Sequence, residues 1–204
     1  MNTARIIGRS LFIALIASVI RAEDAMNAQA QPLVGTETAT FAGGCFWCGE
    51  AIFQSLDGVT KITPGYTGGH VKDPSYDQVC SGDTGHAEAI RIEYDPSKVH
   101  FEELLNLFWQ AHDPTQLNRQ GADIGTQYRS AIFYHGEAQK KTAEDSIRKL
   151  AASGTYPGKI VTTLEPAGDF YEAEDYHQNY YRKNSNAPYC VFVIRPKLKK
   201  LGIE

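Results

Sequence analysis

The stretch Gly43-Gly44-Cys45-Phe46-Trp47-Cys48-Gly49-Glu50 separates two segments of different periodicity. Residues 37–42 alternate polar and apolar, which is typical of a strand, and residues 51–56 continue at helical spacing until Asp57-Gly58. The sequence therefore predicts a strand, a glycine-rich turn and a helix that begins at Cys45. Free backbone N–H groups and the helix dipole at such an end favour a thiolate over a thiol.

Cys48 lies one turn further along the predicted helix, within reach of Cys45 for a disulfide. Two thiols beside Phe46 and Trp47 suggest redox chemistry next to an apolar pocket. Two plainer interpretations stay open, namely a pair of buried core cysteines and two aromatic rings that only fill the core.

Composition limits the possible classes of protein. The chain has 204 residues, of which 42% are hydrophobic, and this suffices for one sizeable core without a second domain. Its formal net charge is −4, with acidic and basic residues interspersed, so we expect no nucleic-acid partner. Four cysteines in a chain of this length do not form the pattern of a disulfide scaffold.

The N-terminal residues differ from the rest of the chain. Arg5 and Arg9 precede an apolar run over residues 11–20, and Ala28-Gln29-Ala30 follows. This is the order of a secretory signal, and the apolar run is too short to span a bilayer comfortably. We expect residues 1–30 to be a signal peptide and the mature domain, 31–204, to be exported, to the periplasm if the source is bacterial. An uncleaved anchor, a transit peptide and a mis-assigned start that leaves a cytoplasmic protein are the alternatives.

The remaining periodicity predicts a mixed α/β or α+β sheet with helices packed on it. Strands are predicted over residues 59–67, 86–94, 130–134, 159–164 and 190–194, and helices over 101–111 and 137–152. Residues 70–85 and 115–126, rich in glycine and polar residues, are predicted to be long loops. The stretch 172–183, with tyrosines among acidic residues, fits neither period.

Glu88 is an unusual residue for its position. It lies on the same predicted strand face as Ile90 and Ile92, where burying an ionised carboxylate is costly. Burial would raise its pKa and keep it protonated near neutral pH, which makes it a candidate proton donor. The alternative is a carboxylate in water at a frayed strand end.

Three polar residues in or beside the predicted loops are weaker candidates on their own. Tyr76 and Tyr128 can each donate a phenolic hydrogen bond, although loop tyrosines more often serve packing. Asp123, within Gly121-Ala122-Asp123-Ile124-Gly125, is most simply a turn residue.

His86-Ala87-Glu88 and Cys45-x-x-Cys48 together contain the parts of a zinc deaminase signature. The order is wrong, because H-x-E precedes C-x-x-C in that signature, and two bulky aromatics would have to fit inside the zinc knuckle. A thioredoxin-like oxidoreductase is a second alternative, although the residues between its cysteines are normally small. We therefore expect no metal, and keep protein disulfide exchange and a zinc-stabilised binding module as competing functions.

Taken together, five segments in fixed order resemble the A-type peptide-methionine (S)-S-oxide reductases. They are residues 43–47, 65–69, 76–88, 112–115 and 118–130, and the resemblance covers residues 37–198. It implies a single-domain α+β roll on a ferredoxin-like mixed sheet, with helices packed on the sheet and long wrapping loops. It also implies reduction of the S epimer of methionine sulfoxide, free or in proteins, as repair of oxidative damage.

The resemblance also implies a role for each candidate residue. Cys45 would attack the sulfoxide sulfur and be left as a sulfenic acid. Glu88 matches the family's proton donor, and Asp123 matches a supporting carboxylate. Tyr76 and Tyr128 match the two phenols that hold the sulfoxide oxygen. Phe46 and Trp47 match the apolar wall for the substrate's methyl group.

The chain departs from a common pattern of the family, in which glycine follows Gly-Cys-Phe-Trp and cysteines of a C-terminal tail resolve the sulfenic acid. Here Cys48 occupies that position, and no cysteine follows Pro196. Resemblance to the variant with this motif implies Cys48 as the resolving thiol, Cys190 as a second choice in a buried strand, and Cys80 as structural. It further implies a monomer without bound cofactor or stable membrane insertion, which takes electrons from thioredoxin or a thioredoxin-like dithiol.

Overall fold

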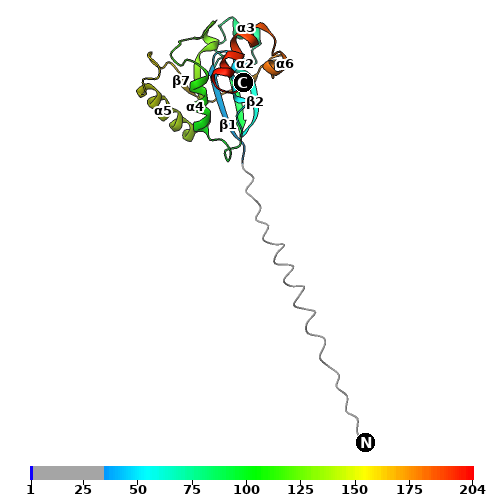
Figure 1. Cartoon of the computed structure of the whole chain (residues 1–204). Coiled ribbons are helices and arrows are strands. Elements are labelled where there is room, and N and C mark those ends of the chain that lie inside the picture. Colours follow the sequence, from blue (N-terminus) through cyan, green and yellow to red (C-terminus); the bar gives the residue numbers. More distant parts are fainter. Residues whose placement is uncertain (2–34) are drawn as a thin grey trace. The chain divides into compact units, whose positions relative to one another are not determined.

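The computed structural model describes Met1 and residues 35–204 (Figure 1). The predicted signal peptide over residues 1–30 therefore lies outside the described residues, apart from Met1. Among the described residues, no helix is long and apolar enough to cross a membrane.

The described chain is organised on a six-stranded sheet with the order β7-β6-β1-β3-β2-β8. Strands β6 and β7 run parallel, and the other neighbours in this sheet run antiparallel. The strands are β1 (Glu37–Gly43), β2 (Val59–Thr67), β3 (Ala87–Tyr94), β6 (Ser130–Tyr134), β7 (Thr163–Pro166) and β8 (Phe170–Glu172).

The four central strands have the ferredoxin-like arrangement. Helix α2 (Phe46–Phe53) connects β1 to β2, and α4 (Phe101–Ala111) connects β3 to β6, while β3 lies between β1 and β2. This gives the central order β6-β1-β3-β2 with every central pair antiparallel. The predicted α+β fold on a ferredoxin-like mixed sheet is confirmed.

One face of the sheet carries the main core beneath α2, α4 and α5 (Glu137–Ala152) (Figure 1). The ring of Phe41 in β1 lies 4.9 Å from that of Phe108 in α4 and 5.8 Å from that of Phe53 in α2. The alternation predicted for β3 is confirmed: Ile90 and Ile92 face this core. The opposite face holds a smaller cluster of Ala42, Ala87, Ala89, Ala131 and Phe133.

One predicted strand lies later in the chain than expected, and another is wrong. Residues 159–164 contribute only their last two positions to β7, because Val161 instead donates its N–H to the carbonyl of Pro114 at 2.8 Å. Residues 190–194 form a π-helical turn, η2 (Cys190–Ile194), that continues into α7 (Arg195–Lys200). Cys190 and Ile194 are buried while Phe192 between them is exposed, and a short apolar run cannot distinguish a strand from a helix by period alone.

The predicted loops contain short elements that the sequence did not indicate. Residues 70–85 include α3 (Tyr76–Cys80), which begins after a capping box at Ser75. Residues 115–126 include the two-stranded hairpin of β4 (Arg119–Gln120) and β5 (Asp123–Ile124), followed by the 3₁₀ turn η1 (Thr126–Tyr128). The unassigned stretch 172–183 ends in α6 (Tyr180–Lys183).

Candidate active site

A tight turn between β1 and α2 places the first cysteine. Gly44 has a positive φ of 88°, and a Cβ at this position would lie 2.7 Å from the side chain of Gln120, so glycine is required. Cys45 follows with extended dihedral angles, φ −60° and ψ 127°, as the residue that precedes the helix, and α2 begins at Phe46. The predicted strand, turn and helix are confirmed, with the helix start one residue later.

The thiols of Cys45 and Cys48 are both buried, and each shifts the pKa of the other. Burial raises the pKa of the Cys45 thiol well above its ordinary value. The neighbouring Cys45 thiol lowers the pKa of Cys48 to about 7, and the charge of Lys197 acts in the same direction. The expected lowering of the pKa at Cys45 is therefore wrong, because the loss of water around the thiol raises the pKa by more than the helix end lowers it. The first proton lost from the pair leaves the charge on Cys48.

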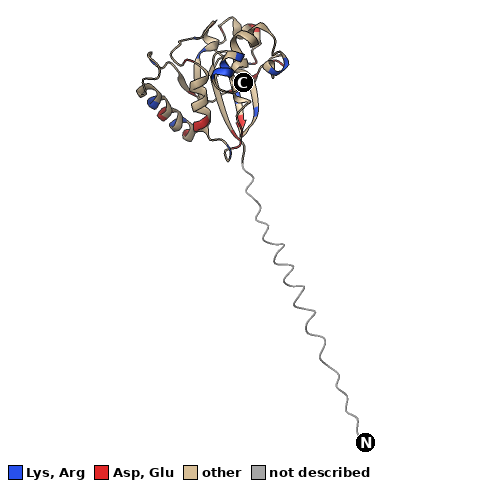
Figure 2. Ribbon diagram, in the orientation of Figure 1, with Lys and Arg blue, Asp and Glu red and all other residues tan. Residues whose placement is uncertain are grey.

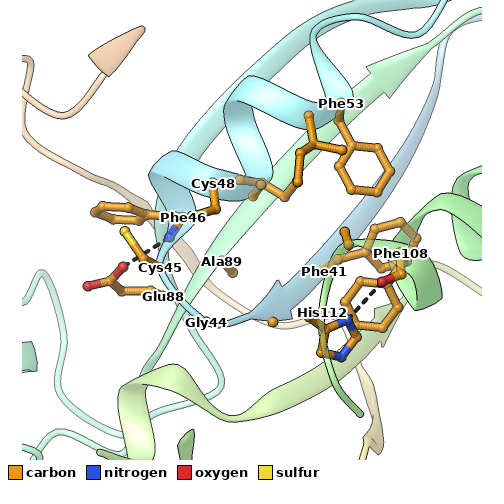
Figure 3. Close-up of a pocket in the computed structure, with 15 residues that line it drawn as sticks. Phe41, Gly44, Cys45, Phe46, Cys48, Phe53, Glu88, Ala89, Phe108 and His112 are labelled. Carbon is orange, nitrogen blue, oxygen red and sulfur yellow. Dashed lines mark hydrogen bonds between the residues drawn. The ribbon is translucent and has the colours of Figure 1, made fainter. Parts of the chain in front are cut away.

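Glu88 lies on the helix-covered face of β3, directly across from Tyr66 of β2, and is 2% exposed. Burial raises the pKa of Glu88 to about 8, although the N–H of Phe46 donates to its Oε2 at 3.1 Å (Figure 3). The Cys45 thiol also acts on this carboxyl and lowers its pKa, but by less than burial raises it. The predicted burial of Glu88 and its raised pKa are confirmed, and the frayed-end alternative is wrong.

The two phenols come from the short elements within the predicted loops. Tyr76 is the first residue of α3, and its backbone N–H donates to Glu174 at 2.8 Å. Tyr128 is the last residue of η1. Burial raises the pKa of both phenols. Both hydroxyls therefore stay protonated at neutral pH and can donate hydrogen bonds.

Asp123 reaches the thiols through a tyrosine that the sequence did not single out. The hydroxyl of Tyr189 donates to Oδ2 of Asp123 at 2.7 Å and lies 3.9 Å from Sγ of Cys48. Burial raises the pKa of Tyr189. Asp123 is thus more than a turn residue, because it fixes a hydroxyl beside the second thiol.

Trp47 is held from several sides by the C-terminal part of the chain. Its indole stacks on Tyr180, with ring centroids 3.6 Å apart and planes within 6°, and meets Tyr189 edge-on. The indole Nε1–H donates to Nδ1 of His177 at 3.1 Å. The ring of Phe46 lies 5.0 Å from that of His177. The two aromatics of the motif therefore form a wall with residues about 130 positions away.

His177, Tyr180 and Tyr189 are site residues that sequence reasoning missed. The excess of tyrosine in residues 172–183 was the available signal, but it has no period that would assign a role. His177 is 1% exposed, and the bond from Trp47 makes its Nδ1 the acceptor, so the neutral ring carries its proton on Nε2. Nε2 has no hydrogen-bond partner among the described residues.

The other two cysteines are not neighbours of Cys45, although Cys80 acts on the phenol of Tyr76 and raises its pKa. Cys190 is fully buried, as expected, but in the π-helical turn. Cys80, expected to be structural, is exposed at the end of α3, where Val79 is the buried side chain. Cys80 is therefore not a core residue.

A small, partly open hollow adjoins the thiols between α2 and α4 (Figure 3). Cys45, Cys48 and Glu88 line it together with core aromatics such as Phe41 and Phe108. Trp47, Tyr76 and Tyr128 do not line this hollow, so it meets the site from the side of the core.

Charge around the site is uneven (Figure 2). Helix α5 carries both signs, whereas α7 next to α2 carries Arg195, Lys197, Lys199 and Lys200. Within residues 35–204, no cluster of three or more His, Cys, Asp or Glu side chains could hold a metal ion.

The family described as peptide methionine sulfoxide reductase matches residues 37–203. A relative from Deinococcus radiodurans, peptide methionine sulfoxide reductase MsrA, is 54% identical over 171 residues, which are 84% of this chain and 83% of the relative. The reduced form of Mxr1 from Saccharomyces cerevisiae superimposes with a TM-score of 0.72 at 36% identity, over 78% of this chain and 91% of Mxr1. The structure of Mxr1 in complex with Trx2 superimposes with a TM-score of 0.52 at 25% identity, over 76% of this chain and 91% of Mxr1. The chain therefore belongs to the MsrA-type peptide methionine sulfoxide reductases, oxidoreductases that reduce methionine sulfoxide.

Proposed function

We propose that the protein reduces the S epimer of methionine sulfoxide, free or in proteins, with Cys45 as nucleophile and Glu88 as proton donor. The observation that carries this assignment is a buried carboxyl, Glu88, that accepts the N–H of Phe46, the residue after Cys45, at 3.1 Å and whose pKa of about 8 keeps it protonated at neutral pH. Membership of the family supports the overall reaction.

In the first step, the sulfur of Cys45 attacks the electrophilic sulfoxide sulfur while Glu88 gives its proton to the departing oxygen. Tyr76 and Tyr128 donate hydrogen bonds to that oxygen. The proton of Cys45 passes to the thiolate of Cys48, whose pKa of about 7 leaves it partly ionised at neutral pH. The protonated oxygen then passes from the substrate sulfur to the sulfur of Cys45 while the transient bond between the two sulfurs breaks. Methionine leaves, Cys45 is oxidised to a sulfenic acid and Glu88 is left as a carboxylate.

In the second step, the thiol of Cys48 attacks the sulfenic sulfur of Cys45, and a disulfide and one water form. The position of Cys48 in the first turn of α2, where its backbone N–H donates to the carbonyl of Cys45 at 3.1 Å, supports Cys48 as the partner. An external dithiol then reduces the disulfide and becomes a disulfide itself. The complex of the relative Mxr1 with Trx2 supports a thioredoxin-like protein in this role, and no bound cofactor is required.

Phe46 and Trp47 form the apolar wall that receives the methyl group and so selects the S epimer. Asp123 supports this side of the site because it accepts a hydrogen bond from the hydroxyl of Tyr189. We propose a monomer, because each residue of the mechanism comes from one chain.

We also propose that residues 31–204 are the mature domain of an exported, periplasmic protein and that residues 1–30 are its signal peptide. The match to the family from residue 37 onward agrees with a domain that begins near this point. An exported enzyme cannot meet cytosolic thioredoxin, so electrons would have to cross the membrane through a thioredoxin-like relay. Retention in the cytoplasm is the alternative.

The decisive experiment incubates the protein with dabsyl-methionine sulfoxide and dithiothreitol and measures dabsyl-methionine. We expect turnover by the wild type and none by Cys45→Ser. Insulin reduction without methionine formation would select a disulfide oxidoreductase instead, and bound zinc with neither activity would select a binding module. Residual turnover by Cys45→Ser would remove Cys45 from the nucleophile role.

A further inference from the structure

Glu50 is a buried carboxyl that the proposed reaction does not use. It lies on α2 one turn beyond Phe46 and Trp47, and it is 1% exposed. Burying a carboxylate is costly unless hydrogen bonds compensate for the lost water. Both oxygens are compensated from the C-terminal part of the chain: Oε1 accepts the N–H of Asn179 at 2.7 Å, and Oε2 accepts the N–H of Tyr180 at 3.0 Å.

These two N–H groups belong to the start of α6, where helical N–H groups have no partner within the helix. Asn179 precedes the helix in the left-handed conformation, with φ 56° and ψ 37°, and its own side chain does not cap the helix. Glu50 thus supplies from another element the cap that α6 lacks, and it fixes the backbone at the point where the chain turns into α6.

The fixed backbone is that of Tyr180, whose ring stacks on Trp47 at 3.6 Å. Helix α2 therefore holds the same tyrosine twice, by the indole of Trp47 and, one turn later, by the carboxylate of Glu50. If the backbone of Tyr180 shifted, its ring would leave the face of the indole.

We propose that Glu50 is a positioning residue for the substrate wall, which holds Tyr180 against Trp47 so that the indole receives the methyl group of the substrate. This inference rests on the proposed function of Trp47. Glu50 touches neither substrate nor reacting atoms, so its removal should weaken the binding of the sulfoxide and leave the chemical step nearly unchanged.

Glu50→Gln is the sharpest probe, because it keeps the shape of the side chain but leaves one acceptor oxygen for two N–H donors. The matched control is Gln54→Ala, on the same helix, which removes an exposed bond from Gln54 to the side chain of the same Asn179. Both variants should be made in the background Trp109→Phe, so that Trp47 is the only tryptophan.

Two readouts test the role. In single turnover without reductant, Glu50→Gln should raise the half-saturating sulfoxide concentration about tenfold, the scale for one lost charge-assisted hydrogen bond, with the maximal rate within about twofold. Acrylamide should quench Trp47 fluorescence more strongly than in the background protein. Gln54→Ala should match the background protein in both readouts.

A double-mutant cycle with Tyr180→Leu decides whether Glu50 acts through Tyr180. The double variant should have the half-saturating concentration of Tyr180→Leu alone, because no ring remains to be positioned. Additive effects, or unchanged binding and quenching in Glu50→Gln, would overturn the inference while wild-type turnover still upheld the proposed function. If Glu50→Gln does not fold, Glu50→Asp, which is too short to reach both N–H groups, serves in the same cycle.

Discussion

The backbone N–H of Phe46 donates to Oε2 of Glu88 at 3.1 Å, which ties the proposed proton donor to the first turn of the helix that begins after Cys45. The bond occupies one carboxyl oxygen and leaves the other for the proton. Because the bond stabilises the charged form and burial opposes it, the resulting pKa of about 8 reflects burial as the larger effect. The carboxyl is thus both oriented and kept protonated near neutral pH.

Glu88→Gln should slow the single-turnover release of methionine about 10²-fold or more near pH 7 to 8, the usual scale for a lost general acid. The amide keeps the shape and accepts the Phe46 N–H, but it has no acidic proton to give. The loss should shrink at low pH, where solvent supplies protons. Glu93→Gln, on the solvent-facing part of the same strand, is the control and should keep the wild-type rate. An unchanged rate in Glu88→Gln near pH 8 would contradict the role of Glu88.

The same carboxyl should make the stability of the fold depend on pH. The pKa of Glu88 is raised from an unfolded value of about 4.3, so the folded state keeps a proton that the unfolded state releases. The resulting stability is fully present below pH 4 and is lost as pH rises toward 8, by about 4 kcal/mol between pH 5 and pH 8. Glu88→Gln should lack this loss.

Urea unfolding at pH 5 and pH 8 measures the difference. The free energy of unfolding should fall less with pH in Glu88→Gln than in the wild type, and Glu93→Gln should follow the wild type. Equal pH dependence in all three proteins would mean that Glu88 is ionised in the folded state.

The wall of Phe46 and Trp47 should make the enzyme selective for one epimer. With resolved epimers and dithiothreitol, chromatography should show consumption of the S sulfoxide and none of the R sulfoxide. Trp47→Ala should raise the half-saturating concentration of the S epimer at least about tenfold, because a pocket for one methyl group discriminates on this scale. Equal consumption of both epimers by the wild type would exclude this pocket.

The sequence predicted the part of the site that lies within contiguous motifs. The turn before α2 depends on Gly44, and the burial of Glu88 on the alternation of β3, so local patterns sufficed for both. The ferredoxin-like order came from resemblance, since periodicity alone gave only a mixed sheet with helices.

What the sequence missed depends on contacts between distant segments. Tyr180 and His177 meet Trp47 only after the C-terminal part folds over α2, and no local period announces this contact. The prediction of a lowered pKa at Cys45 was wrong for the same reason. A helix end is visible in the sequence, but the burial that outweighs its effect on the pKa is not. The run at residues 190–194 was ambiguous because both a strand and a buried helical turn are apolar.

Replacing either Cys48 or Cys190, the two candidates for the resolving thiol, separates the two halves of the catalytic cycle. Cys48→Ser should release about one methionine per enzyme and then stop when a thioredoxin-like protein is the only reductant, because the sulfenic acid has no partner thiol. The release should be slower than in the wild type, since serine cannot take the proton of Cys45 as Cys48 does. Cys190→Ser should recycle normally, because Cys190 is fully buried in η2.

Peptide mapping after one turnover identifies the bridge directly. Cys45 precedes the helix with extended dihedral angles and Cys48 lies in its first turn, so a disulfide between them needs a change only in the first turn of α2. The wild type should therefore show Cys45 linked to Cys48. A bridge from Cys45 to Cys190 would require η2 to open, and finding it would overturn the second step while leaving the first intact. Continued recycling of Cys48→Ser with the thioredoxin-like protein would lead to the same conclusion from kinetics, because another thiol would then have to resolve Cys45.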